Sequence, residues 1–166
     1  MQLKVMTIQR IISGGQTGVD RAALDVAREL GLPCGGWCPK GRTAEDGLIN
    51  RRYPLKETPS EEYAQRTEWN VRDSDGTLVL ARGKLSGGTA QTVEVAARLG
   101  KPYLVVDLAK RPSAIAVRRW VQRNHVRALN AAGPRESKAP GIYAEASEML
   151  RTILSPRVRV ESRPHE

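Results

Sequence analysis

Short apolar runs alternate along the chain with longer segments whose apolar residues recur at helical spacing. The apolar runs predict strands at 10–13, 33–38, 55–58, 76–81, 102–106 and 126–132. The helical spacing, with Gly or Pro near the ends, predicts helices over 21–30, 60–72, 87–99, 113–123 and 142–154. Such alternation is typical of α/β proteins with a doubly wound, mainly parallel sheet flanked by helices on both faces. We therefore expect one domain over residues 1–154 and a polar, basic tail over 155–166.

Three local patterns sharpen this expectation. The runs at 76–81 and 102–106 contain almost no polar residues, which predicts strands that are buried on both faces. Residues 39–54 are rich in Gly, Pro and charged residues, so we expect a long loop, and loops of that length in compact domains are often functional. Ser60, followed by two acidic residues, predicts the N-cap of a helix.

Two glycine-rich segments, 13–21 and 86–94, each join a predicted strand to a predicted helix. Free backbone N–H groups and the helix dipole favour an anion there, and glycine lets phosphate oxygens approach the backbone. The spacing matches neither the dinucleotide fingerprint nor the P-loop, and one such segment alone is equally well explained as a tight turn. Two of them favour an anion site at the carboxyl ends of the strands, where such sheets bind ligands. The candidate contacts are Gly14, Gly15, Gln16, Thr17, Gly87, Gly88 and Thr89.

Two further loops add cations and a hydroxyl group. The candidates for contacting an anion in these loops are Lys40, Arg42, Arg135 and Ser137. Arg135 follows the last predicted strand, and its guanidinium has the shape to bind a phosphate. Trp37, next to the first of these loops, is a candidate for stacking on a ring. The competing interpretations are exposed surface cations and a tryptophan that belongs to the core.

Composition adds one unusual feature, a net charge of +9 from 27 Lys+Arg and 18 Asp+Glu. Such a charge first suggests nucleic acid, but aromatic residues make up 4% and Phe is absent, which argues against base-stacking platforms. Residues 101–166 hold 13 of the basic and 6 of the acidic residues, and 108–135 holds seven basic residues and no acid. The charge excess therefore lies away from the glycine-rich segments, and we do not expect a nucleic-acid partner.

Membrane insertion, secretion and metal binding find no support in the sequence. The longest apolar runs are about five residues where a membrane helix needs about 20, and no signal-peptide segment opens the chain. Cys34 and Cys38 do not form a disulfide framework, and neither His125 nor His165 completes a zinc site or a Cys–His pair with them. We expect a cytoplasmic protein without membrane contact and without a protein-ligated metal.

Several long strings of residues resemble a known family. They are SGGQTGVDRAALD at 13–25, GGWCPKG at 35–41, RTEWNVRDSDGTL at 66–78, SGGT at 86–89 and AGPRES at 132–137. These strings resemble the molybdenum cofactor carrier proteins, over about residues 10–154. The resemblance implies a Rossmann-like fold and a homo-oligomer, either a dimer or a tetramer. It also implies that a phosphorylated pterin, the molybdenum cofactor, is bound without turnover.

A more distant resemblance points to an enzyme. Residues 86–94 are similar to the P-G-G-x-G-T-x-x-E string of the lysine-decarboxylase-like, cytokinin-activating phosphoribohydrolases. That resemblance implies catalytic roles for Glu94 and for Arg66, which precedes Asp75 by the same nine residues as in that family. The departures from the string are Ser86, Ala90 and Gln91. They leave a phosphate cradle intact and weaken the case for hydrolysis of an N-glycosidic bond.

The leading hypothesis is therefore a binding protein for an anionic small molecule, either a phosphorylated pterin or a nucleotide-like ligand. The alternative is a nucleoside-monophosphate phosphoribohydrolase that uses Glu94 and Arg66. The residues alone leave open whether the protein is an enzyme.

Overall fold

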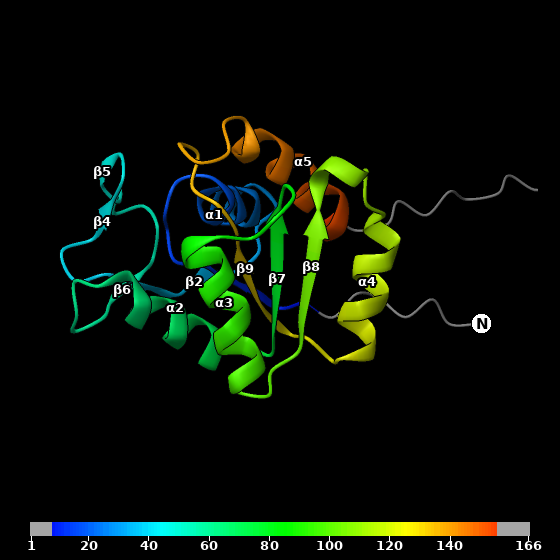
Figure 1. Cartoon of the computed structure of the whole chain (residues 1–166), viewed down its shortest axis with the longest axis horizontal. Coiled ribbons are helices and arrows are strands. Elements are labelled where there is room, and N and C mark those ends of the chain that lie inside the picture. Colours follow the sequence, from blue (N-terminus) through cyan, green and yellow to red (C-terminus); the bar gives the residue numbers. More distant parts are fainter. Residues whose placement is uncertain (1–7, 156–166) are drawn as a thin grey trace, which may run out of the picture.

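A computed structural model describes residues 8–155, so most of the predicted tail lies outside the described part of the chain. Its central sheet has five strands, all parallel, in the order β2-β1-β9-β7-β8. The strands are β1 (Arg10–Ile12), β2 (Cys34–Gly35), β7 (Gly76–Ala81), β8 (Tyr103–Asp107) and β9 (Ala128–Ala132). The predicted α/β fold with a parallel sheet is confirmed (Figure 1).

Helices cover both faces of this sheet. They are α1 (Val19–Glu29), α2 (Tyr63–Arg72), α3 (Gly87–Arg98), α4 (Ala114–Arg123) and α5 (Ile142–Leu154), with a short 3-10 helix η1 (Leu108–Lys110). Helices α1, α4 and α5 share one aliphatic core with the strands, and α2 packs on α3 through Val71, Val95 and Ala96. This arrangement is the Rossmann-like architecture that the sequence predicts.

The order of the strands places the last strand of the chain at the centre of the sheet. β9 pairs with β1 on one side and with β7 on the other, through partners such as Ile11 with Leu129 and Val79 with Ala132. If β9 is counted first, the order becomes 3-2-1-4-5, which is the order of a Rossmann sheet. The chain is thus a circular permutation of that fold. The topological switch point, where such folds bind ligands, lies between β9 and β7.

The segment before α2 differs from the prediction. The predicted strand at 33–38 divides into β2, in the main sheet, and β3 (Trp37–Cys38), which pairs with β6 (Lys56–Glu57) in a separate parallel sheet. The chain bends between them at Gly36, whose φ is +133° and where a Cβ would lie 2.4 Å from the carbonyl oxygen of Ser13.

The predicted loop at 39–54 also contains regular structure. Strands β4 (Thr43–Ala44) and β5 (Gly47–Leu48) form an antiparallel hairpin, which lies at the opposite end of the molecule from α4 (Figure 1). Because this segment is rich in Gly and charged residues, its sequence did not indicate these two strands of two residues each. The hairpin brings acidic residues to the rim of the cavity described below.

Two finer predictions are wrong. Strand β8 is not fully buried, since Tyr103 and Val105 are 41% and 40% exposed. Among the strands of residues 8–155, β8 lies at the edge of the sheet and pairs only with β7. Ser60 is not the N-cap of α2, which begins at Tyr63 after Glu62. The Ser60 hydroxyl accepts a hydrogen bond from the N–H of Glu62 and forms a turn ahead of the helix instead.

Candidate functional site

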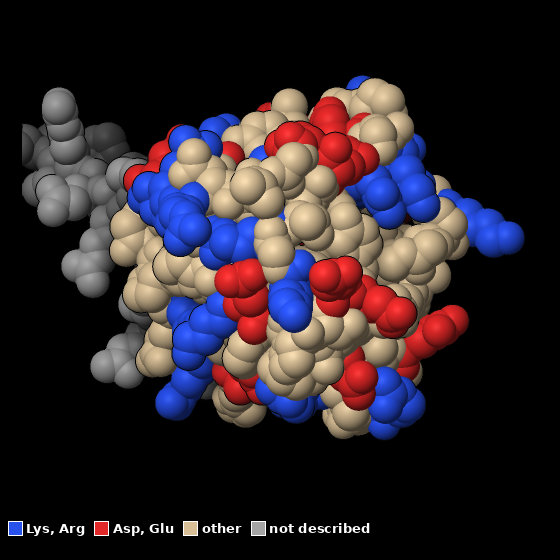
Figure 2. All heavy atoms as spheres, turned by 90° about the vertical axis from the view of Figure 1, so that its left-hand side faces the viewer, with Lys and Arg blue, Asp and Glu red and all other residues tan. Residues whose placement is uncertain are grey.

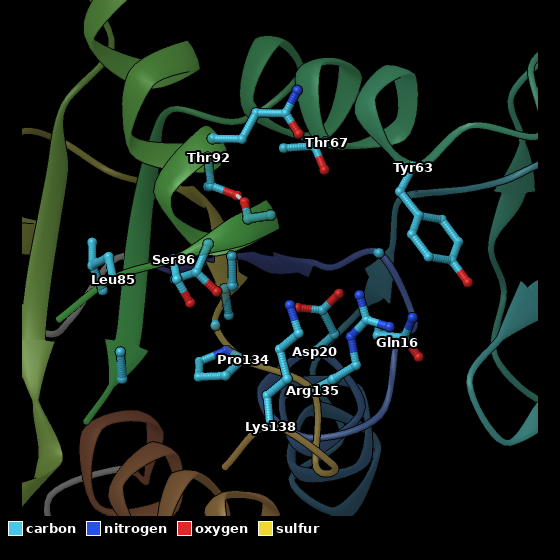
Figure 3. A pocket seen from close by; sticks show the side chains of 18 of the residues that line it. Gln16, Asp20, Tyr63, Thr67, Leu85, Ser86, Thr92, Pro134, Arg135 and Lys138 are labelled. Atoms are coloured by element: carbon cyan, nitrogen blue, oxygen red, sulfur yellow. Dashed lines mark hydrogen bonds between the residues drawn. The ribbon is translucent and has the colours of Figure 1, made fainter. Parts of the chain in front are cut away.

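A cavity of about 270 Å³ opens at the switch point between β7 and β9. Its walls come from the carboxyl ends of these strands, the β1–α1 and β9–α5 loops, the N-terminus of α3 and one side of α2. In Figure 3, Thr67 and Thr92 of α2 and α3 face Arg135 and Lys138 of the β9–α5 loop across this space. The cavity therefore lies where the fold class predicts a ligand.

The predicted site residues divide into two groups. Those that line the cavity are Gly14, Gln16, Arg66, Gly88, Thr89 and Arg135. Those outside its lining are Gly15, Thr17, Lys40, Arg42, Gly87, Ser137 and Glu94. The structure thus brings both glycine-rich segments and the β9–α5 loop to one cavity, but through only part of each.

We use the name cationic end for the part of the lining that is rich in basic residues. Lys84, Arg135 and Lys138 line it, and none of them has an acidic partner within 4 Å in the described part of the chain. Lys138 Nζ lies 3.2 Å from the position that a Cβ on Gly87 would take, beside the start of α3. The Ser86 side chain makes no capping hydrogen bond, so the first N–H groups of α3 remain available. Free N–H groups, a helix dipole and three cations without a direct ion pair together favour an anion, although the charge of Arg135 also acts on Glu45 at the rim.

We use the name paired end for the part of the lining that holds a buried ion pair. Arg66 Nη1 on α2 lies 2.8 Å from Asp20 Oδ2 on α1, and the two side chains are 13% and 6% exposed. The pair joins helices on opposite faces of the sheet across the backbone of Gly14, where a Cβ would lie 1.6 Å from Arg66 Nη1. The Tyr63 ring stacks on the guanidinium at 5.4 Å. A side chain at position 14 would therefore displace the Arg66 guanidinium from its place beside Asp20.

Burial is the largest influence on the pKa of Asp20. Burial raises the pKa of Asp20, and the charge and hydrogen bond of Arg66 act against that rise. A buried carboxylate opposes the binding of a second anion next to it. The two ends of the cavity therefore differ in what they can bind: the cationic end suits an anion and the paired end suits a neutral polar group.

A carboxylate of the chain itself, that of Glu45, lies at the rim of the cavity beside Gln16. Glu45, in the β4–β5 hairpin, accepts hydrogen bonds from the hydroxyl groups of Thr17 and Ser137 and from the N–H of Ser137. These bonds, that from the Ser137 side chain first, hold the pKa of Glu45 below its ordinary value. Its own N–H donates to Gln16 Oε1 at 2.9 Å. Thr17 and Ser137 thus bind a carboxylate, as the sequence suggested for an anion, but that carboxylate belongs to the hairpin.

Arg42 serves the fold rather than a ligand. Its guanidinium donates to four backbone carbonyl oxygens, at 3.0 to 3.2 Å. The acceptors are Ile49, Asn50, Tyr53 and Leu55. These bonds use the donors that the sequence analysis assigned to an anion. Lys40 is exposed and lies outside the cavity.

Three further candidates also lie elsewhere. Trp37 packs edge to face on Trp69, with ring centroids 4.7 Å apart, and donates from Nε1 to Asp73, so its ring is engaged away from the cavity. Gly15 packs under Leu55. Glu94 is exposed on α3, one turn beyond Gln91, which does line the cavity. The proposed pair of catalytic residues is therefore separated, since only Arg66 reaches the cavity.

Sequence analysis missed several lining residues, of which Asp20, Tyr63, Lys84 and Lys138 carry the most chemistry. Lys84 follows strand β7 by three residues, directly before a glycine-rich segment, and that position was a usable signal. Lys138 follows Arg135 by three positions and comes directly after the string at 132–137 that was already singled out. Asp20 lies within the glycine-rich segment 13–21, but its pairing with Arg66, like the place of Tyr63, depends on contacts with residues far along the chain.

No metal centre is formed within residues 8–155, where no three His, Cys, Asp or Glu side chains gather. Cys34 and Cys38 are unbonded thiols, and burial raises the pKa of both. Among the described helices, none has the length and apolar character needed to cross a bilayer.

Fold and site together define a Rossmann-like protein with a cation-lined cavity at its switch point. The chain belongs to the circularly permutated YpsA SLOG family, whose model matches residues 11–154. The permuted strand order seen above explains the first words of that description.

A solved structure is closely similar. It is a protein from Syntrophus aciditrophicus SB named "putative molybdenum carrier protein", with 46% sequence identity and a TM-score of 0.89. The similarity covers 92% of this chain and 98% of that one. Among curated proteins no match is found.

Proposed function

We propose that this protein binds and carries a small anionic molecule, either a phosphorylated pterin such as the molybdenum cofactor or a nucleotide-like ligand. The observation that carries the proposal is that Lys84, Arg135 and Lys138 line one cavity with the N-terminus of α3, and that none of them has an acidic partner within 4 Å among residues 8–155. A phosphate there would receive backbone N–H bonds and charge-assisted side-chain bonds. The name of the similar protein from Syntrophus aciditrophicus SB supports a cofactor that contains molybdenum.

The cavity favours binding without turnover. Hydrolysis of an N-glycosidic bond needs a carboxylate near the sugar, and Glu94 is exposed outside the cavity. The one carboxylate in the lining, Asp20, is already paired with Arg66. A carrier requires neither an acid nor a base at the ligand, so it matches these residues better than the phosphoribohydrolase does.

Native mass spectrometry of protein purified from a host that makes the molybdenum cofactor tests the proposal. A bound mass equal to the cofactor, or saturable binding of a nucleoside monophosphate in isothermal titration calorimetry, supports it. If neither the cofactor nor any common nucleoside monophosphate binds at millimolar concentration, the proposal is wrong. Release of ribose 5-phosphate from a monophosphate would instead establish the enzyme.

The proposal includes a homo-oligomer in the cytoplasm, as the family resemblance implies. Light scattering coupled to size-exclusion chromatography measures the mass in solution. A mass of 18.3 kDa would show a monomer, and a multiple of it would show the oligomer.

A further inference from the structure

We propose that Asp20 and Arg66 recognise the edge of a neutral heterocycle, in which a ring carbonyl accepts from Arg66 and adjacent N–H groups donate to Asp20. The chemical group with this pattern is the 2-amino-4-oxopyrimidine edge that guanine nucleotides and pterins share. The inference rests on the proposed function, because it assigns the ring end of the same ligand. It adds a specificity that the cationic end cannot supply.

The first step is an unsatisfied donor. Arg66 Nε is the one buried side-chain nitrogen or oxygen atom within residues 8–155 that lacks a hydrogen-bond partner. Such atoms are rare in folded proteins, and each costs about 1–3 kcal/mol while it stays unpaired. Nε itself is covered, but the Arg66 side chain lines the cavity, so a ligand acceptor would bind the rest of this guanidinium.

The second step is the charge of that acceptor. Asp20 compensates the guanidinium at 2.8 Å, and both side chains are nearly buried. A phosphate or carboxylate next to Arg66 would be repelled by Asp20, and the low local dielectric strengthens that repulsion. The acceptor is therefore neutral, and a ring carbonyl is the common neutral acceptor of planar heterocycles.

The third step is the free capacity of Asp20. A carboxylate accepts about four hydrogen bonds. Arg66 supplies one to Oδ2, and the backbone of Gln16 supplies another. The remaining positions accept N–H groups, and a ring N–H beside an exocyclic amino group presents two of them side by side.

The fourth step is the shape of this end. The Arg66 guanidinium lies over the Tyr63 ring, 5.4 Å from its centroid, so two flat groups on which a planar ring can stack line this part of the cavity. Asp20 and Tyr63 lie in the same cavity as Arg135 and Lys138 (Figure 3). One ligand with a phosphate and a flat ring can therefore use both ends.

The test compares ligands that differ in the recognised edge. Isothermal titration calorimetry on the intact protein would use GMP with IMP, which lacks the 2-amino group, and AMP, which also lacks the carbonyl. A second pair is neopterin monophosphate with its analogue that carries a 2-oxo group in place of the amino group. In whichever pair binds, we expect the amino compound to bind at least about tenfold more tightly. The pair that binds better tells a nucleotide from a pterin as the source of the edge.

The outcomes separate this inference from the proposed function. Equal affinities within both pairs overturn the inference and leave the anion carrier intact. Absence of binding by all five compounds and by the molybdenum cofactor overturns the proposed function itself. The comparison uses the natural chain, so it needs no variant to fold.

Variants then locate the discrimination. Asp20→Asn keeps the size of the side chain and removes acceptor capacity, so the preference for the amino compound should fall to less than about twofold. Asp73→Asn is the matched control, because Asp73 is paired with Arg72 at the end of α2 and lies outside the cavity. Circular dichroism and the Tm of both variants check folding. A folded Asp20→Asn variant with an unchanged preference contradicts the inference.

Discussion

In two regions of this protein, basic residues look equivalent in the sequence but make different contacts in the fold. Around the cavity, Lys84, Arg135 and Lys138 have no acidic partner among residues 8–155. In the segment before α2, Arg42 binds four carbonyl oxygens, and Asp46 accepts from both terminal nitrogens of Arg21 on α1.

The difference teaches that what a cation can bind depends on what already occupies its donors. Donors of the second region are used within the chain, so that region stabilises the fold. Donors of the first are open to a ligand. The face that contains the β4–β5 hairpin shows basic and acidic residues interspersed, as expected where cations are paired (Figure 2).

The largest effect on stability is expected in the region where the hydrogen-bond donors of arginine are already bonded within the chain. Arg42→Ala would leave four carbonyl oxygens without their donors, so we expect the free energy of unfolding to fall by about 2–3 kcal/mol. Urea denaturation measures it. Lys40→Ala is the matched control, because Lys40 is exposed nearby, and should change stability by less than about 0.5 kcal/mol. An equal loss of unfolding free energy in both variants would contradict the difference between the two regions.

The region with open donors should show the reverse behaviour. Lys138→Ala or Arg135→Ala should weaken binding of a phosphorylated ligand about tenfold, which corresponds to about 1.4 kcal/mol, with little change in Tm. Calorimetry of the variants against the ligand found for the natural protein measures the change. Full affinity in the double variant would show that the cationic end is not the anion site.

The rim between the regions should respond to pH. Hydrogen bonds from Ser137 and Thr17 lower the pKa of Glu45 from its ordinary 4.5, so this contact stabilises the hairpin above that pH. The stabilisation is lost as pH falls through the lower folded-state pKa. An NMR titration of the Ser137 amide should therefore show a transition below pH 4.5 that is absent in Glu45→Gln. A transition at or above 4.5 would contradict the contact.

The smallest effect is expected at Glu94. This side chain is exposed and lies outside the cavity, so Glu94→Gln should leave ligand affinity within about twofold and stability within about 0.5 kcal/mol. The same calorimetric and urea experiments measure both. A large loss of affinity would return Glu94 to the site and reopen the case for hydrolysis.

Much of the fold and part of the site were predictable from local sequence. Helix α3 begins at Gly87, where the glycine-rich segment predicted it, and α5 has the predicted bounds of 142 and 154. The loop residues Gly14, Gly88 and Arg135 do line one cavity. These features follow from neighbouring residues, since helix ends and apolar periods depend on contacts a few positions apart.

The rest depended on residues far apart in the chain. Thr17 and Ser137 are hydroxyl residues in the expected loops. Their hydroxyl groups donate hydrogen bonds to Glu45, because the β4–β5 hairpin folds over the rim of the cavity. Strand β8 has the apolar content of a central strand and lies at the edge instead. No local pattern records which strand will be its neighbour.

By itself the sequence determined an α/β domain, a parallel sheet and glycine-rich segments at helix N-termini, because spacing and backbone chemistry act locally. Only the tertiary structure decided that β9 would lie at the centre, and so where the switch point and the cavity would form. It also decided that Arg66 would meet Asp20, 46 positions earlier, while three other cations stayed open. Strand order and the pairing of charges depend on how distant segments pack together, and local patterning does not encode that packing.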